Sequence, residues 1–467
     1  MSGMFGGIKV VLCAALVTSV LGASRRPATA ADGDSHLLTF DDASGQIATA
    51  IASGAADEDN AFFASLGTNG RRCVTCHQPS DAWSITPAHV QARFAESAGA
   101  DPIFTSNDGS TCEGIVATSQ AERRAAYGLL LDRGLIRVGL NVPPGAEFVI
   151  ERVDDPNHCG PATTDASLYR RPLPSTNLRF LSAVMWDGRE SSPTTTILQD
   201  LAHQAIDATL GHAQALQAPT PAEVDQIVGF ETGLFTAQAF DAQAGLLSAQ
   251  RAAGGPIALG RQPFFTAIND PVGFNPTGAT FDPNVFTIFE YWGGLAASPA
   301  GPRTESRLAV ARGEAIFNTR PITISGVAGL NGETFATGAS LPGSFTGSCS
   351  VCHDAPNAGD HSVKAPLDIG VADPARAPYL PVYTLRNLAT HDTVQTTDPG
   401  RAMITGKWKD VGKFKGPILR GLAARAPYFH NGSAATLQEV VDFYDVRFNI
   451  GLSAQERADL VAFLRAL

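Results

Sequence analysis

Two copies of one five-residue motif restrict what this chain can fold around more than any other feature of its sequence. Each copy has two cysteines three positions apart and a histidine directly after the second. The copies are Cys73, Cys76 and His77, and Cys349, Cys352 and His353. In C-x-x-C-H the thiols add across the haem vinyl groups, and the histidine binds the iron as proximal ligand. A zinc site would need four ligands at finger-like spacing, and no others stand nearby. The sequence therefore predicts two covalent c-type haems.

The first 30 residues have the pattern of a secretory signal peptide. One positive charge, Lys9, precedes an apolar run from Val10 to Leu21, and Ala28 and Ala30 offer a small-residue cleavage site. The run is too short to cross a bilayer, and no other stretch is long and apolar enough for a membrane helix. We therefore expect a protein of the periplasm, where c-type haem is attached, with no membrane span.

The charge of the chain argues against nucleic acid or anionic lipid as a partner. Its formal net charge is -11. Loss of residues 1–30 would remove three basic residues and make the charge more negative still. A contrary feature is the lysine cluster of residues 407–415, with lysines at 407, 409, 413 and 415. The cluster suits either a dock for an acidic redox partner or a solvated loop, and the loop is the favoured interpretation.

Two further cysteines, Cys112 and Cys159, are left after the haem motifs and the signal segment are set aside. In an oxidising compartment such a pair favours a disulfide, and the alternative is two unpaired buried thiols. Neither is followed by the residues of a third haem motif.

The expected fold is mainly α, with two cytochrome c-type haem domains and long irregular connections. We place an N-terminal haem domain at 31–300 and a C-terminal haem domain at 301–467. Helices are predicted over 305–320, 436–448 and 453–467, and the last two begin with the capping pattern S/T-x-x-E. On the second of these helices, Val440, Tyr444 and Phe448 share one face. Residues 255–302 are rich in Gly and Pro and are predicted to be irregular.

Three further segments carry a resemblance to a known family. They are A-P-Y-F-H-N-G-S at 426–433, W-D-G-R at 186–189 and L-A-H-Q-A at 201–205. In this order, with two C-x-x-C-H motifs, the chain resembles bacterial dihaem cytochrome c peroxidases and MauG. The resemblance covers both haem motifs and most of residues 300–467. It is weak over about 90–170, which implies an insertion in the N-terminal domain.

The resemblance implies a division of labour between the two haems. The haem held by His77 would react with peroxide, and the haem held by His353 would store or relay electrons. Trp186 matches the family's tryptophan between the haems, although an aromatic side chain there also suits ordinary packing. Tyr444 stands where the peroxidases have a methionine ligand and MauG a tyrosine. Its alternative role is core packing, in which case Met403 becomes the rival axial ligand.

Other positions depart from the peroxidase pattern. By residue count the family's distal glutamate falls at Gln214, whose amide cannot carry a proton at neutral pH, and His212 is the nearest titratable replacement. The family's removable loop histidine falls at Arg93, so an open first haem is expected. Arg171 and Arg425 stand where the family binds calcium, so that calcium is possible only through backbone carbonyls.

The leading interpretation is a periplasmic dihaem oxidoreductase of the peroxidase/MauG type. Hydrogen peroxide would be the oxidant, and a small periplasmic electron donor or a client protein would supply the electrons. One alternative is a dihaem oxygenase resembling the rubber oxygenases, with dioxygen as oxidant. Another is a dihaem electron-transfer cytochrome with both irons six-coordinate.

Overall fold

The structure is a computed structural model that describes residues 37–160, 165–297 and 301–467, so the predicted signal peptide lies outside the described residues. The α-helices within these ranges are α1 Cys73–Cys76, α2 Pro87–Ser97, α3 Gln120–Ala126, α4 Gly128–Arg133, α5 Ile197–Gly211, α6 Pro221–Thr232, α7 Pro256–Gly260, α8 Glu290–Gly293, α9 Thr304–Thr319, α10 Ala402–Thr405, α11 Leu437–Phe448 and α12 Ala454–Arg465. The strands are β1 Leu37–Asp42, β2 Gly45–Ile51, β3 Ile136–Asn141, β4 Phe148–Asp154, β5 Asp165–Arg170, β6 Leu234–Asp241, β7 Gly245–Leu246, β8 Ile322–Ser325, β9 Ser344–Gly347, β10 Val382–Asn387 and β11 Thr393–Thr396.

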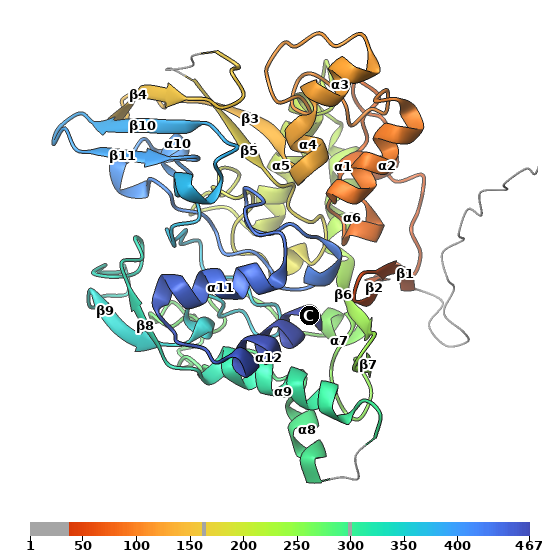
Figure 1. The fold of residues 1–467 in the computed structure, drawn as a ribbon, viewed down its shortest axis with the longest axis vertical. Coiled ribbons are helices and arrows are strands. Elements are labelled where there is room, and N and C mark those ends of the chain that lie inside the picture. The colour runs from red at the N-terminus through yellow and green to blue at the C-terminus, as the bar shows by residue number, and fades with distance from the viewer. Residues whose placement is uncertain (1–36, 161–164, 298–300) are drawn as a thin grey trace, which may run out of the picture.

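The three predicted C-terminal helices are confirmed as α9, α11 and α12, and Figure 1 shows them together in the lower part of the molecule. Ser453 and Glu456 form the predicted capping box of α12, and the Thr436 side chain accepts from the Glu439 amide at the start of α11. Helices α9 and α12 cross in close contact at Gly313. A Cβ atom there would lie 2.1 Å from the Asp459 carbonyl oxygen, so the crossing requires glycine.

Four sheets within the described ranges add a β content that the sequence analysis did not expect. The largest has the strand order β1-β2-β6-β7, and two-stranded sheets join β3 to β5 and β8 to β9. The strands are short, between two and eight residues, and several alternate buried and exposed positions only weakly. Short strands of this kind give little periodic signal in a sequence.

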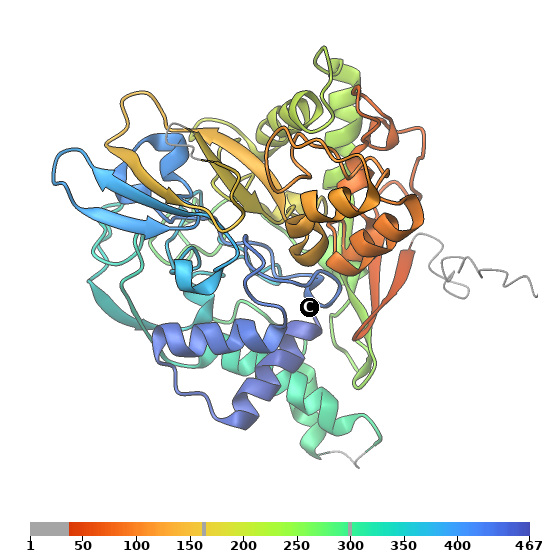
Figure 2. The ribbon, with the colours of Figure 1, turned by 45° about the horizontal axis from the view of Figure 1, so that its top comes forward.

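One sheet connects segments that are far apart in the chain. Its order is β11-β10-β4, with β10 antiparallel to both neighbours and Leu385 opposite Ile150. Figure 2 shows the yellow strand β4 beside the blue strand β10. The backbone of the segment 90–170 is therefore hydrogen-bonded to the C-terminal half. The predicted disulfide between Cys112 and Cys159 is confirmed in this segment.

Residues 255–302 are largely irregular where described, as predicted, with the short helices α7 and α8 and a 3-10 turn at Gly294–Ala297. Their side chains nevertheless belong to the C-terminal core, because Phe286, Phe289 and Trp292 pack in one cluster with Phe317 of α9 and Phe463 of α12. Packing is therefore continuous across residue 300, where the sequence analysis placed a domain boundary. Among the described residues, no helix is long and apolar enough to cross a membrane.

Candidate haem sites

The first C-x-x-C-H motif lies in the wall of a deep cavity. The single turn of α1 places the thiols of Cys73 and Cys76 on this wall, with His77 directly after the helix. The facing wall is mostly apolar and comes from the segment 172–186 and from α5 and α6. Its apolar side chains include Leu178, Leu181, Val184, Leu201 and Ile227.

The second motif lies in the wall of a second cavity. Cys349, Cys352 and His353 line it together with one face of α11. The three residues of α11 predicted to share a face, Val440, Tyr444 and Phe448, all line this cavity. Both motifs therefore present two thiols and an imidazole to an enclosed, largely apolar space.

Both proximal histidines are oriented by a backbone carbonyl. Nδ1 of His77 lies 3.1 Å from the Trp83 oxygen, and Nδ1 of His353 lies 2.7 Å from the Gly359 oxygen. Because a carbonyl only accepts, Nδ1 carries the proton and Nε2 keeps its lone pair. Burial lowers the pKa of His77 to about 4 and also lowers the pKa of His353, so both rings are neutral at pH 7.

The thiols are protonated in the folded chain. Burial raises the pKa of Cys73, Cys349 and Cys352 to about 12 and also raises the pKa of Cys76. Paired thiols on one wall, a neutral imidazole with a free Nε2 and an apolar surround form the donor set and environment that covalent haem requires. The residues of both cavities therefore fit a c-type haem.

The two cavities share one wall. Seven residues line both: Arg171, Pro172, Pro174, Trp186, Lys415, Pro417 and Arg425. The Trp186 indole donates to the Arg171 carbonyl oxygen over 2.8 Å, and the Trp186 carbonyl oxygen accepts from the Lys415 amide over 2.9 Å. Two hydrogen bonds thus hold Trp186 in the wall that is common to both cavities.

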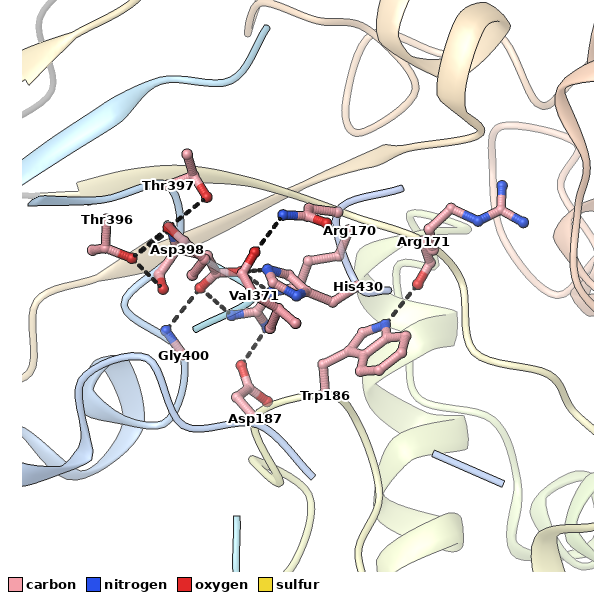
Figure 3. A network of polar contacts seen from close by, with 12 residues as sticks. Arg170, Arg171, Trp186, Asp187, Val371, Thr396, Thr397, Asp398, Gly400 and His430 are labelled. Carbon is pink, nitrogen blue, oxygen red and sulfur yellow. Dashed lines mark hydrogen bonds and ion pairs between the residues drawn. The ribbon is translucent and has the colours of Figure 1, made fainter. Parts of the chain in front are cut away.

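A buried ionic network holds the W-D-G-R segment in place (Figure 3). Arg170 bonds both oxygens of Asp398, over 2.7 and 2.9 Å, and also pairs with Asp187. Asp187 is 0% exposed and pairs with Arg189 as well. Burial alone would raise the pKa of Asp187, but the charges of Arg170 and Arg189 and their hydrogen bonds lower it to about 2. The network fixes the residue next to Trp186.

His430, from the A-P-Y-F-H stretch, lies beside this network in the wall of the second cavity. Its ring stacks on Phe414 with the centroids 4.0 Å apart and meets Trp186 edge-on at 6.1 Å. Neither ring nitrogen has a hydrogen bond to any described residue, and Nε2 lies 3.7 Å from an Asp398 oxygen. Burial lowers the pKa of His430 to about 4, so the ring is neutral. Its aromatic contacts continue the wall from Trp186 into the second cavity.

The structure separates the two distal candidates. His212 lines the first cavity, and its Nδ1 contacts Asp108, which also pairs with the buried Arg71. Burial would raise the pKa of Asp108, but its bonds to His212 and Arg71 lower it. Gln214 is exposed and does not line the cavity, because the chain leaves α5 in a left-handed conformation with φ of 54° at this residue. The residue count from Leu201 therefore does not lead to a cavity position.

Two residues of the first cavity were missed by the sequence analysis as candidates. Gln204 of the L-A-H-Q-A segment lines the cavity. Glu231, near the end of α6, is 4% exposed, and one of its carboxyl oxygens has no hydrogen-bond partner. Burial raises the pKa of Glu231 to about 7, although a hydrogen bond from Ser175 partly opposes this. No motif marks Glu231 in the sequence, and only its place on the buried face of an amphipathic helix gives a signal.

The two candidate axial ligands lie in different places. Tyr444 lines the second cavity, and burial raises the pKa of its hydroxyl well above the ordinary value. Met403 is 3% exposed and packs in the core beneath β4 and β10, with Phe148 and Leu385, and it lines neither cavity. The histidine nearest in sequence to Arg93, His89, pairs with Asp81 and does not line the first cavity.

The lysine cluster is not a solvated loop throughout. Lys407 and Lys409 are exposed, but Lys413 and Lys415 are buried, and Lys415 lines both cavities. The solvated-loop interpretation is therefore wrong for these two residues, because the segment passes between the haem cavities. The shared wall also does not suit calcium. Three of its seven residues are cations, and a dication among them would be repelled.

The fold and the sites define a haem c protein with two cavities, each built on one C-x-x-C-H motif. Comparison with known proteins agrees with this class. Residues 413–448 match the family model described as RoxA-like, cytochrome c-like. The cytochrome-c peroxidase IdrP1 of Pseudomonas sp. (strain SCT) is 37% identical over 139 residues, which are 26% of this chain and 36% of that protein. The cytochrome c551 peroxidase of Nitrosomonas europaea is 34% identical over 125 residues, 26% of this chain and 31% of that protein.

These matches agree with the resemblance to bacterial cytochrome c peroxidases. The similarity spans only about a third of the length of these relatives. A crystal structure of a MauG-like protein associated with microbial copper homeostasis aligns over 86% of this chain and 85% of its own, with 16% identity and a TM-score of 0.37. That score is too low to carry an argument.

Proposed function

We propose that the protein is a periplasmic dihaem oxidoreductase of the peroxidase type. In this proposal hydrogen peroxide is reduced at the His77 site, and electrons enter at the His353 site from a small redox protein or a client protein. The observation that carries the proposal is the pair of cavities, each with a C-x-x-C-H motif, that share the wall at Trp186. The similarity to cytochrome c peroxidases supports it.

The residues of the two C-x-x-C-H motifs would hold the cofactors. Haem iron supplies one-electron redox chemistry and binding of the oxidant. The four motif cysteines hold the two groups, and Nε2 of His77 and of His353 would bind the irons. Reduction of peroxide to two waters consumes two electrons and two protons. The protein must therefore supply both an electron path and a proton source.

His212 is the proposed proton source in the first cavity. Asp108 holds its Nδ1, so Nε2 is the atom that can exchange a proton with a group in the cavity. Splitting the peroxide bond requires a proton on the leaving oxygen, and a positioned imidazole suits this at neutral pH. Gln204 adds an amide that can hold peroxide by hydrogen bonds. The exposed Gln214 has no part in this proposal.

Trp186 is the proposed electron path, because its indole lies in the wall common to both cavities and contacts His430 at 6.1 Å. Tyr444 is the proposed sixth ligand of the second haem. Tyr444 lines that cavity, whereas Met403 lies in a different core. A phenolate would favour the ferric state, because it is an anionic oxygen donor.

Haem count is tested first. The mass of the mature protein, after extraction of non-covalent haem, should exceed that of the polypeptide by two haem groups. A single addition would reject the dihaem architecture.

Stopped-flow mixing of the diferric protein with hydrogen peroxide then tests the chemistry. His212→Ala should slow the reaction by ~10²-fold or more, in the range typical of lost general acid catalysis. Gln214→Ala, two residues further on and exposed, is the control and should react at the wild-type rate. An unchanged rate in the His212 variant would remove His212 as the proton source. A wild-type protein inert to peroxide would reject the peroxidase proposal.

The oxygenase alternative remains a second candidate, because residues 413–448 match a RoxA-like family model and the first cavity has a broad apolar wall. Such a wall suits an apolar organic substrate better than peroxide alone requires. Oxygen uptake by the reduced protein in the presence of an alkene, without peroxide reactivity, would favour it. Two low-spin, six-coordinate haems inert to both oxidants would instead indicate an electron-transfer cytochrome.

A further inference from the structure

Three buried or partly buried cations gather where the two cavities meet. Arg171 is 4% exposed and Lys415 is 8% exposed, and Arg425 lies beside them in the same shared wall. They come from three separate places in the sequence: the end of β5, the lysine cluster and the stretch before A-P-Y-F-H. The fold therefore concentrates positive charge at one point between the cavities.

Within the part of the chain that the structure describes, none of the three cations forms an ion pair with a carboxylate. Arg171 donates only to carbonyl oxygens, those of Ile85, Arg133, Gly134, Arg425 and Ala426. Arg425 donates to the Ile418 carbonyl over 2.6 Å, and its Nε has no partner. The Lys415 ammonium forms neither a hydrogen bond nor an ion pair within the described residues. The negative charge of Asp360 acts on Lys415 against the effect of burial, although the two side chains form no ion pair within the described residues.

Burying three cations side by side is energetically unfavourable unless an anion binds among them. Burial lowers the pKa of Arg171 and Arg425 to about 10 and that of Lys415 to about 8, although the Asp360 charge opposes the shift at Lys415. Buried cations normally have a carboxylate or phosphate partner, because removing a charge from water without one is unfavourable. An anion that completes the site would reach the shared wall from a cavity, because no carboxylate of the described residues contacts the three cations.

We propose that Arg171, Lys415 and Arg425 form a carboxylate site that takes propionate groups from both haems and stands in place of a calcium ion. A covalent haem has two propionates and no other acidic groups. A haem in either cavity has these cations in its wall. The inference rests on the proposed dihaem function, since it requires both cofactors.

The site has an electrostatic consequence for both irons. A positive charge near a haem favours the reduced form, because reduction removes one positive charge from the iron. A cation that lines both cavities therefore raises the reduction potentials of both haems together. A surface lysine, screened by water and salt, has no comparable effect.

Lys415→Met is the test, measured by spectroelectrochemical titration of the two-haem protein. Both midpoint potentials should shift to lower values, and Lys415→Arg should restore them because it keeps the charge. Lys409→Met is the matched control, since Lys409 is exposed in the same segment, and it should shift neither potential. A shift of one potential alone, or of neither, in a variant that still carries two haems would overturn the shared site. Failure of the proposed function is recognised separately, because a protein that does not carry two haems fails the haem count before any potential is measured.

A second measurement does not depend on a variant that folds. Metal analysis of the wild-type holoprotein after dialysis against a calcium chelator should find no calcium, and adding calcium should leave the spectra and both potentials unchanged. One tightly bound calcium ion per chain, or a loss of the wild-type spectrum on chelation, would overturn the replacement. If Lys415→Met does not fold, Arg425→Met should produce the same joint shift, and unchanged potentials in that variant would reject the site.

Discussion

At the scale of single residues, Glu231 is a carboxyl group enclosed in a haem cavity. It lies in the last turn of α6, where the carbonyl ends of the helix add to the cost of a negative charge. Its pKa is raised to about 7 from an ordinary value near 4.5. The folded state therefore favours the protonated carboxyl group, and ionisation of Glu231 destabilises the fold.

The pH dependence follows from the sign of this shift. The contribution of Glu231 to stability is fully present below about pH 4.5 and is lost as the pH rises through about 7. Glu231→Gln should therefore unfold at a higher denaturant concentration than the wild type at pH 8. The gain should be on the order of 3 kcal/mol at most, and it should shrink towards zero near pH 4.5. Asp225→Asn, on the exposed side of the same helix, is the control. A pH-independent difference would contradict the prediction.

Tyr444 gives the second prediction at this scale. Tyr444→Met should convert the second haem to a low-spin form of higher potential, because a thioether replaces an anionic oxygen donor. Absorption spectra and redox titrations of the holoprotein would show the change. Met403→Leu should leave both unchanged, since Met403 packs outside the cavities. Wild-type spectra in the Tyr444 variant would mean that the tyrosine only packs against Phe448.

Residues carried by local motifs could be predicted, and residues placed by tertiary structure could not. The haem motifs, Trp186 and Tyr444 line the cavities as the motifs implied. Gln214 was placed by counting along a helix that ends at Gly211, so the count ran beyond the element that justified it. Glu231 and Asp108 reach the first cavity through folding of distant segments, which leaves no mark in the sequence near the motifs.

At the scale of elements, the W-D-G-R segment is irregular backbone that ionic contacts hold in place. Asp187 pairs with Arg170, at the end of β5, and with Arg189 within the segment. Since Trp186 is the adjacent residue, the position of the indole depends on these pairs. Ion pairs, and not the hydrogen bonds of a helix or a strand, therefore fix the conformation of this segment.

Asp187→Asn should weaken the fold in a pH-dependent way. The pKa of Asp187 is lowered to about 2 from about 3.8, so its contribution is present above about pH 4 and is lost as the pH falls towards 2. Denaturant unfolding at pH 7 should show that the free energy of unfolding of the variant is lower than that of the wild type by about 2 kcal/mol. This difference should be smaller at pH 3. Asp154→Asn removes an exposed ion pair and should cost almost nothing. An equal cost for the two variants would contradict this account.

The capped helices could be predicted as elements, because their start signals are local. Ser453 and Glu456 mark α12 from the sequence alone. The strands could not, because β10 becomes a strand by pairing with β4 more than 200 residues earlier. That pairing depends on how the whole chain folds.

At the scale of the whole molecule, the regions around the two C-x-x-C-H motifs are connected by backbone pairing and by buried ion pairs. Strand β4 pairs with β10, and Arg170 binds Asp398 across the same boundary. The continuous core around Phe286 and Phe463 adds a third connection. The regions are therefore expected to unfold together rather than as separate domains.

Hydrogen exchange measures this coupling. The amides of β4 and β10 should be protected to the same degree in the wild type, because their hydrogen bonds open together. Arg170→Met should lower the protection of both strands. Arg152→Met removes only an exposed ion pair and should leave protection unchanged. Loss of protection in β4 alone would show that the two regions open independently.

The chemistry of the four motif thiols also orders the biogenesis of the protein. A thiol with a pKa of about 12 is a thiolate in roughly one chain in 10⁵ at pH 7. Attack on a vinyl group needs the thiolate, so a chain that closes before it receives its haems becomes almost unreactive towards them. Attachment of haem is therefore expected to come first, on an open polypeptide. Substitutions that hasten closure would lower the yield of holoprotein even where they strengthen the finished fold.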